Sequence, residues 1–132
     1  MKKFYLSTYH FLFLTISIIS WVYLLGFDYI KPTNVNWLNS GDLSTYQLGW
    51  EYFRDDKWRF PIGLNPNYGI YSDSNIIYSD SIPIFAIFFK LFNFLLPEKF
   101  QYFSIWILLC IYLQILFSYK IIYIGTGNKL FS

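Results

Sequence analysis

Hydrophobic and polar positions divide the chain into four parts, the first of which is a long apolar run. Residues 4–27 carry His10 as their only ionisable side chain. About 24 helical residues at 1.5 Å each extend roughly 36 Å, which is enough to cross about 30 Å of hydrocarbon. The run is too long for a removed signal peptide, and no cleavage site of small residues follows it. Residues 1–27 are therefore predicted to form a short cytoplasmic end and a first transmembrane helix.

The composition changes abruptly between residues 28 and 81. This part contains Pro32, Pro61 and Pro66, and its Asp and Glu residues outnumber its Lys and Arg residues. Turn formers and charges predict a loop in water, and the loop is longer than a connection between two helices requires. Its many aromatic residues argue against disorder.

One stretch of this loop has helical periodicity. Apolar side chains recur at steps of three and four residues from Leu43 to Phe53, with polar side chains between them. Asp42 precedes the stretch and is a natural residue for a helix N-cap. The pattern predicts an amphipathic helix at about residues 43–53, suited to lying on a membrane surface.

Residues 82–99 begin with a second apolar run that is interrupted by Lys90 and Asn93. The run is too short for an ordinary span, and placing Lys90 at the centre of a bilayer would cost about 3 kcal/mol. We therefore expect an interfacial helix, with Lys90 extending back to the headgroups, in preference to a short third span. Pro97 breaks the helix.

Residues 100–132 supply a second predicted span, from about Phe100 to Ile124, followed by a cytoplasmic end. Lys2, Lys3, Lys120 and Lys129 flank the two spans on the sides away from the loop. Because Lys and Arg near span ends mark the cytoplasmic side, both termini are expected in the cytoplasm. The predicted fold class is an all-α membrane protein with two transmembrane helices, joined by a long outer loop with amphipathic interfacial helices.

The overall composition agrees with a membrane environment. Of the 132 residues, 55% are hydrophobic and only 14% are charged, against roughly 25% charged in a soluble domain. The formal net charge is +2 and the basic residues are scattered, so nucleic acid is not an expected partner. The chain is expected to lie in the cytoplasmic (inner) membrane, with membrane lipid as a partner.

Candidate chemistry is limited to acidic residues, because no phosphate-binding loop, metalloprotease motif or nucleophile elbow occurs in the sequence. Asp42 and Asp80 each precede a predicted helix at the water boundary. A carboxylate there can act as general base for an acceptor hydroxyl, or hold a divalent cation against a phosphate leaving group. Both residues could instead be ordinary helix caps.

Several segments together resemble a known group of proteins: Gly41-Asp42, the residues from Gln47 to Arg54, the residues from Tyr78 to Pro83, Leu96-Pro97, and Phe100-Gln101-Tyr102. The arrangement resembles the N-terminal part of an uncharacterised family of bacterial polytopic membrane proteins. That family looks like the glycosyltransferase C superfold, whose members use lipid-linked sugar donors and carry an acidic residue in the first outer loop.

The resemblance implies catalytic roles for Asp42 and Asp80, which are also the candidate ligands if a divalent cation takes part. It implies a phosphate-binding role for Arg54 or Lys90, and sugar stacking by Trp50, Trp58 and Tyr68, for which core or interfacial packing is the alternative.

The expected function is that of an N-terminal module of a membrane glycosyltransferase that uses a polyprenyl-phosphate-linked sugar. Superfold members have many more spans, so the chain is expected to be a fragment or a reduced relative. Catalysis by this chain alone is not expected, and the remaining spans of a longer protein are expected partners. The alternative is a non-catalytic two-span membrane subunit that acts through protein–protein contacts.

Overall fold

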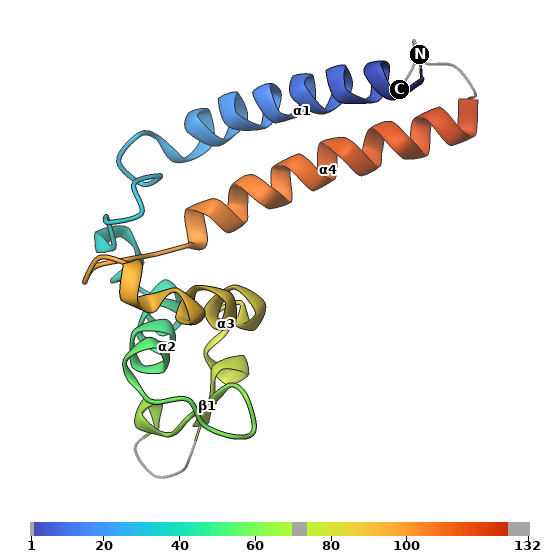
Figure 1. Ribbon diagram of the computed structural model, residues 1–132. Helices are drawn as coiled ribbons and strands as arrows, with labels where there is room; N and C mark the ends of the chain where they lie inside the picture. Colours follow the sequence, from blue (N-terminus) through green and yellow to red (C-terminus); the bar gives the residue numbers. More distant parts are fainter. Residues whose placement is uncertain (1, 70–73, 127–132) are drawn as a thin grey trace. The chain divides into compact units, whose positions relative to one another are not determined.

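The computed structural model describes residues 2–69 and 74–126, with side chains from Tyr9 onward in the first helix. The described residues are mostly helical, with four α-helices and one pair of short strands (Figure 1). The chain divides into two compact units. We call Met1–Lys31 with Phe103–Ser132 the helix-pair unit, and Pro32–Tyr102 the loop unit.

The helix-pair unit consists of α1 (Lys2–Leu25) and α4 (Phe103–Thr126), which lie side by side and antiparallel (Figure 1). Gly26 ends α1 with a φ of +78°, a left-handed conformation that glycine adopts without strain. The indole of Trp21 on α1 donates a 2.7 Å hydrogen bond to the carbonyl of Ser104 on α4. The His10 ring and the Tyr112 hydroxyl form a second polar contact between the helices, at 2.6 Å.

Within the described residues, α4 is the one helix that is long and apolar enough to cross a membrane, with 24 residues. The apolar part of α1, Tyr9–Leu25, is shorter, so the first of the two predicted spans stays a prediction. The predicted start of the second span at Phe100 is displaced to Phe103. The reason is that the amide of Gln101 donates a 2.8 Å hydrogen bond to the carbonyl of Pro32, which holds this segment in the loop unit.

The loop unit is built around α2 (Leu43–Asp55), where the sequence predicts a helix at 43–53. The short strands β1 (Leu64–Asn65) and β2 (Ser74–Asn75) pair antiparallel beside it. Three short helices of this unit lie before α3: η1 (Asn36–Leu38), η2 (Pro66–Tyr68) and η3 (Ile76–Ser79). Its buried apolar side chains are Val35, Leu38, Trp50, Phe53, Ile76, Ala86, Phe100 and Tyr102.

The apolar stripe of α2 faces this core along its second half. Trp50 and Phe53 are fully buried, whereas Leu43 at the start of the helix is exposed. The amphipathic pattern is therefore explained by packing within the loop unit. It does not require the membrane surface that the sequence suggested.

The second apolar run forms α3 (Pro83–Leu91) and a short turn of helix, η4 (Asn93–Leu95). Pro83 occupies the first turn of α3. Backbone N–H groups there have no partner within the helix, so a proline, which lacks the N–H, costs no helical hydrogen bond. Ala86 and Lys90, one turn apart, are buried against the rest of the loop unit. The opposite face of α3 is apolar and exposed.

Candidate functional site

Asp42 lies directly before α2 and has an exposed side chain. The sequence suggested a helix cap, but the carboxylate makes no capping hydrogen bond. Asp42 already has helical backbone angles, φ −65° and ψ −25°, whereas a capping residue usually has an extended backbone. The side chains of Ser44 and Thr45 bond to the carbonyls of Gly41 and Asp42 instead, each at 2.7 Å. The Asp42 carboxylate is thus turned to solvent at the start of α2.

Asp80 is also exposed, but it does not cap a helix N-terminus either. It ends η3, and Ile82 occupies the position before α3. Asp80 and Ile82 have φ values of 51° and 50°. Left-handed angles cost a non-glycine residue roughly 1–2 kcal/mol, and they are most unfavourable for a β-branched side chain such as Ile82.

Two serines fix this strained segment, Ser79 within η3 and Ser81 against α2. The Ser79 hydroxyl donates to the carbonyl of Ile76 at 3.0 Å, and the Ser81 hydroxyl donates to the carbonyl of Tyr46 at 2.6 Å. The two hydroxyl oxygens lie 2.7 Å apart, and the Tyr102 hydroxyl donates to the carbonyl of Ser81. Sequence reasoning missed this network, for which the serines on either side of Asp80 were the available signal.

Gly49 permits the close approach of this segment to α2. A Cβ atom at Gly49 would lie 2.1 Å from the hydroxyl oxygen of Ser79 and 2.6 Å from that of Ser81. Asp80, between the two serines, therefore passes beside the middle of α2. Asp42 precedes Tyr46 by one helical turn, or about 6 Å at 1.5 Å per residue. Asp42 thus lies at the start of α2, and the segment that carries Asp80 lies beside Tyr46 and Gly49 of the same helix.

Tyr68 also contacts α2, on either side of its middle. Its hydroxyl donates a 3.4 Å hydrogen bond to the carbonyl of Thr45, and its ring centroid lies 6.1 Å from that of Tyr52. The side chain is partly exposed. We define Asp42, Tyr68 and Asp80 as the acidic site.

Arg54 lies at the other end of α2 and is buried, with 8% of its surface exposed. All three guanidinium nitrogens donate hydrogen bonds, to the Asn93 amide oxygen at 2.9 Å and to the carbonyls of Glu98 and Pro97 at 3.0 and 3.1 Å. The guanidinium carbon also lies 5.5 Å from the ring centroid of Trp50. This geometry fastens α2 to the turn at Pro97 and does not support the expected phosphate-binding role.

Lys90 is buried as well, with 5% exposed. Its ammonium group donates to the carbonyl of Phe53 and lies 4.0 Å from the ring of Phe53 and 5.0 Å from the ring of Trp58. The Asn93 amide donates to the next carbonyl, that of Arg54, at 3.1 Å. The two polar residues of the second apolar run therefore cap the C-terminus of α2, where carbonyls lack helical partners and a positive charge is favourable.

This placement does not support the headgroup position or the lipid-phosphate role that the sequence suggested for Lys90. Burial lowers the pKa of Lys90, and the nearby Asp56 opposes that shift.

Asp56 itself forms a bidentate ion pair with Arg59, at 2.6 and 3.1 Å. The hydrogen bond from Arg59 lowers the pKa of the Asp56 carboxyl. Sequence reasoning missed this pair, although its spacing of three residues was a usable signal.

The predicted sugar-stacking residues fall into two groups. Trp50 is fully buried, and its indole donates a 3.1 Å hydrogen bond to the carbonyl of Phe100, so the geometry supports core packing. Trp58 is 47% exposed at the Lys90 end of α2, and Tyr68 is at the Asp42 end. Asp42, Asp80 and Tyr68 remain as exposed or partly exposed candidates beside α2 that lie away from the Lys90 end of the helix.

A metal site made by protein ligands alone is not present in the part of the chain that the structure describes. No group of three or more His, Cys, Asp or Glu side chains converges among these residues. Two carboxylates still suffice for Mg²⁺ when substrate phosphates and water complete its coordination.

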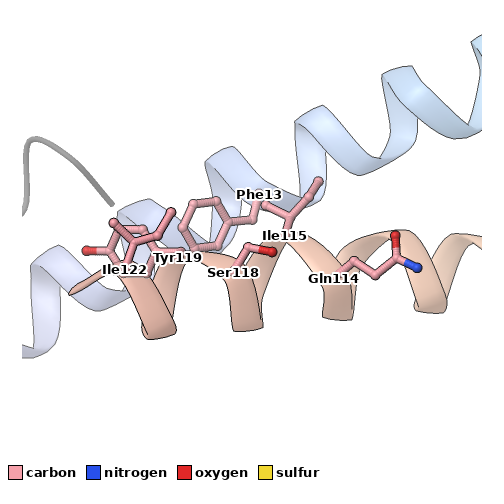
Figure 2. A pocket seen from close by; sticks show the side chains of 6 residues that line it. All are labelled: Phe13, Gln114, Ile115, Ser118, Tyr119 and Ile122. Atoms are coloured by element: carbon pink, nitrogen blue, oxygen red, sulfur yellow. The ribbon is translucent and has the colours of Figure 1, made fainter. Parts of the chain in front are cut away.

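The helix-pair unit has a groove of its own (Figure 2), with a volume of about 460 Å³. Phe13 of α1 lies 5.0 Å from the ring of Tyr119 on α4, and the remaining lining comes from α4. Gln114 and Ser118, one turn apart, bring polar atoms into this groove, and both are exposed.

Comparison with known proteins gave one match. A family model described as "Domain of unknown function (DUF6311)" covers residues 14–132. No curated protein and no solved structure matches the chain. The match confirms the part of the resemblance that concerned an uncharacterised family, and it lends no support to the glycosyltransferase part.

Proposed function

We propose that this chain, which belongs to the DUF6311 family, forms the loop-bearing module of a membrane glycosyltransferase. The proposed reaction passes a sugar from a polyprenyl-phosphate donor to an acceptor hydroxyl outside the cytoplasmic membrane. The observation that carries the proposal is the exposed Asp42 carboxylate, which makes no capping hydrogen bond and lies one helical turn before Tyr46, whose carbonyl holds the segment that carries Asp80.

The Asp42 carboxylate is suited to act as general base. In an inverting transfer, the acceptor oxygen forms a bond to the anomeric carbon while the bond from that carbon to the phosphate oxygen breaks. Asp42 takes the hydroxyl proton, and the polyprenyl phosphate leaves with the electron pair. A general base contributes typically 10²- to 10⁴-fold to such a step.

The leaving phosphate requires a cation, and Arg54 and Lys90 are not suited to supply one. Their charged groups are buried and bonded to carbonyls at the other end of α2. A divalent cation shared by the phosphate and the exposed carboxylate of Asp80 would neutralise the leaving group. The strained backbone at Asp80 supports this role, because strain of this kind concentrates at functional sites.

The direct test is sugar transfer by membranes that contain this chain together with any further spans of its natural protein. We expect Asp42→Asn to lower transfer by about 10²-fold or more, the contribution of a general base, with unchanged helix content. Asp55→Asn is the matched control, because it removes an exposed carboxylate at the opposite end of α2. Equal transfer by Asp42→Asn and Asp55→Asn would refute the catalytic role.

A second candidate function, a non-catalytic membrane subunit, is favoured by the groove of the helix-pair unit. Gln114 is exposed on the helix that can cross a membrane, and a side-chain amide in hydrocarbon is stabilised by hydrogen bonds from another helix. This candidate predicts that Gln114→Leu releases a membrane partner that co-purifies with the wild type. Sugar transfer by the wild type, lost in Asp42→Asn, would decide against it.

A further inference from the structure

The outer face of α3 and η4 carries an unbroken set of exposed apolar side chains. The six residues are between 42% and 80% exposed, and none carries a charge: Ile84, Phe88, Leu91, Phe92, Phe94 and Leu95. Within α3, Ile84, Phe88 and Leu91 recur at steps of four and three residues, so they share one side of the helix. Phe92, Phe94 and Leu95 follow at the end of α3 and in η4. We call this set the α3 face.

The inward position of Lys90 leaves the α3 face free of charge. The ammonium group is bonded to the carbonyl of Phe53, on the side of α3 that packs against α2. An interfacial helix usually keeps its cations at the border of its apolar face. Here the one cation within α3 serves the protein interior, and the outer face offers only aliphatic and aromatic surface.

The order of residues along the chain indicates the partner of this face. The inner side of α3 holds Tyr102 through ring contacts, at 5.4 Å from Phe89 and 5.9 Å from Phe85. Phe103, the next residue, begins the helix that is long and apolar enough to cross a membrane. Consecutive Cα atoms are about 3.8 Å apart. The residue that packs on α3 is therefore bonded directly to the first residue of α4.

We propose that the α3 face binds the boundary between headgroups and acyl chains of the lipid bilayer, on the side where α4 begins. Large exposed apolar patches mark interaction surfaces, and a helix at this boundary typically buries its apolar face by about 5–10 Å. Lipid is the partner that fits, because the face offers no hydrogen-bonding or charged side chain and because Tyr102, which packs on α3, is followed directly by the helix that can cross a membrane. This inference rests on insertion of α4 and is independent of the catalytic proposal.

Nitroxide labels on the whole chain in lipid vesicles test the proposal. In a Cys110→Ala background, Phe88→Cys reports on the α3 face, Lys57→Cys on the exposed polar surface of the loop unit, and Phe117→Cys on α4. We expect the label at position 88 to collide more often with oxygen, which concentrates in lipid, than with a water-soluble nickel complex. Position 57 should show the reverse ratio.

The label at position 117 separates failure of the membrane span from failure of the α3 proposal. When position 117 reports lipid, a nickel-accessible label at position 88 would overturn the proposal, because the face would then lie in water. A label at position 88 that neither reagent reaches would overturn it too, because a protein surface would cover the face. When position 117 itself reports water, the premise that α4 crosses the bilayer is wrong, and the proposal is overturned with it.

Discussion

At the scale of single residues, Lys90 shows how a charge can be stable in an apolar surrounding. A buried ammonium group loses hydration, which ordinarily costs several kcal/mol. Three features offset this loss: the carbonyl of Phe53, the faces of two aromatic rings, and the negative end of the α2 dipole. The cost is visible in the pKa of Lys90, which burial moves below its ordinary value of 10.5.

The shifted pKa of Lys90 predicts a pH dependence of stability. Just below pH 10.5 the unfolded chain binds more protons than the folded chain, because the folded pKa is the lower one. The free energy of unfolding should therefore rise as pH increases through this alkaline window. Thermal unfolding in detergent from pH 8 to 10, followed by circular dichroism, measures the slope.

The variant Lys90→Met should lack this alkaline rise, since methionine has no proton to lose. Lys57→Met, which changes an exposed lysine near the end of α2, should keep it. The same slope in Lys90→Met and in the wild type would show that another group causes the pH dependence.

At the scale of elements, the contact between α2 and the segment from Ser79 to Ser81 fixes where Asp80 lies. The segment approaches α2 at Gly49 more closely than any side chain would permit. Because Ser81 is bonded to the carbonyl of Tyr46, the segment cannot move away without breaking that bond. We therefore regard Gly49 as a positioning residue for the acidic site.

The variant Gly49→Ala tests this packing. A Cβ atom 2.1 Å from the Ser79 hydroxyl oxygen forces the segment outward, and overpacking of this kind typically costs about 1–3 kcal/mol of unfolding free energy. Gly125→Ala is the matched control, because its Cβ meets nothing within 4 Å in α4. The double variant Gly49→Ala with Ser79→Gly should recover part of the loss in thermal unfolding. Equal stability of Gly49→Ala and Gly125→Ala would contradict the close contact.

The sequence predicts elements better than it predicts their contacts. The helix at α2 follows from its spacing of apolar residues, and α3 from the apolar run that begins at Ile82, because both signals are local. The left-handed angles at Asp80 and Ile82 left no such signal, since neither residue is a glycine.

The roles of the charged residues were harder to predict for a related reason. Lys90 caps a helix whose last carbonyls lie 37 positions earlier in the chain. Arg54 bonds to carbonyls 43 and 44 positions later. A single sequence gives no information about such pairings. Lys90 in an apolar run therefore suggested the membrane surface, and the family resemblance suggested phosphate binding by Arg54.

At the scale of the whole molecule, the order of the elements along the chain relates the two units. The loop unit lies between α1 and α4, so two crossings by these helices would leave it on one side of the membrane and both termini on the other. Lys residues flank the predicted spans on the terminal sides, and this asymmetry favours a cytoplasmic position for the termini. Asp42 and Asp80 would then meet their substrates outside the cytoplasmic membrane.

We therefore predict that the loop unit is exposed outside a membrane crossed by both α1 and α4. Labelling of Lys57→Cys in a Cys110→Ala background tests it most directly, because position 57 is exposed in the loop unit. A maleimide that cannot cross membranes should modify this cysteine when added to spheroplasts from outside, and permeabilising the membrane should add no further labelling. Modification only after permeabilisation would place the loop unit in the cytoplasm and contradict the account.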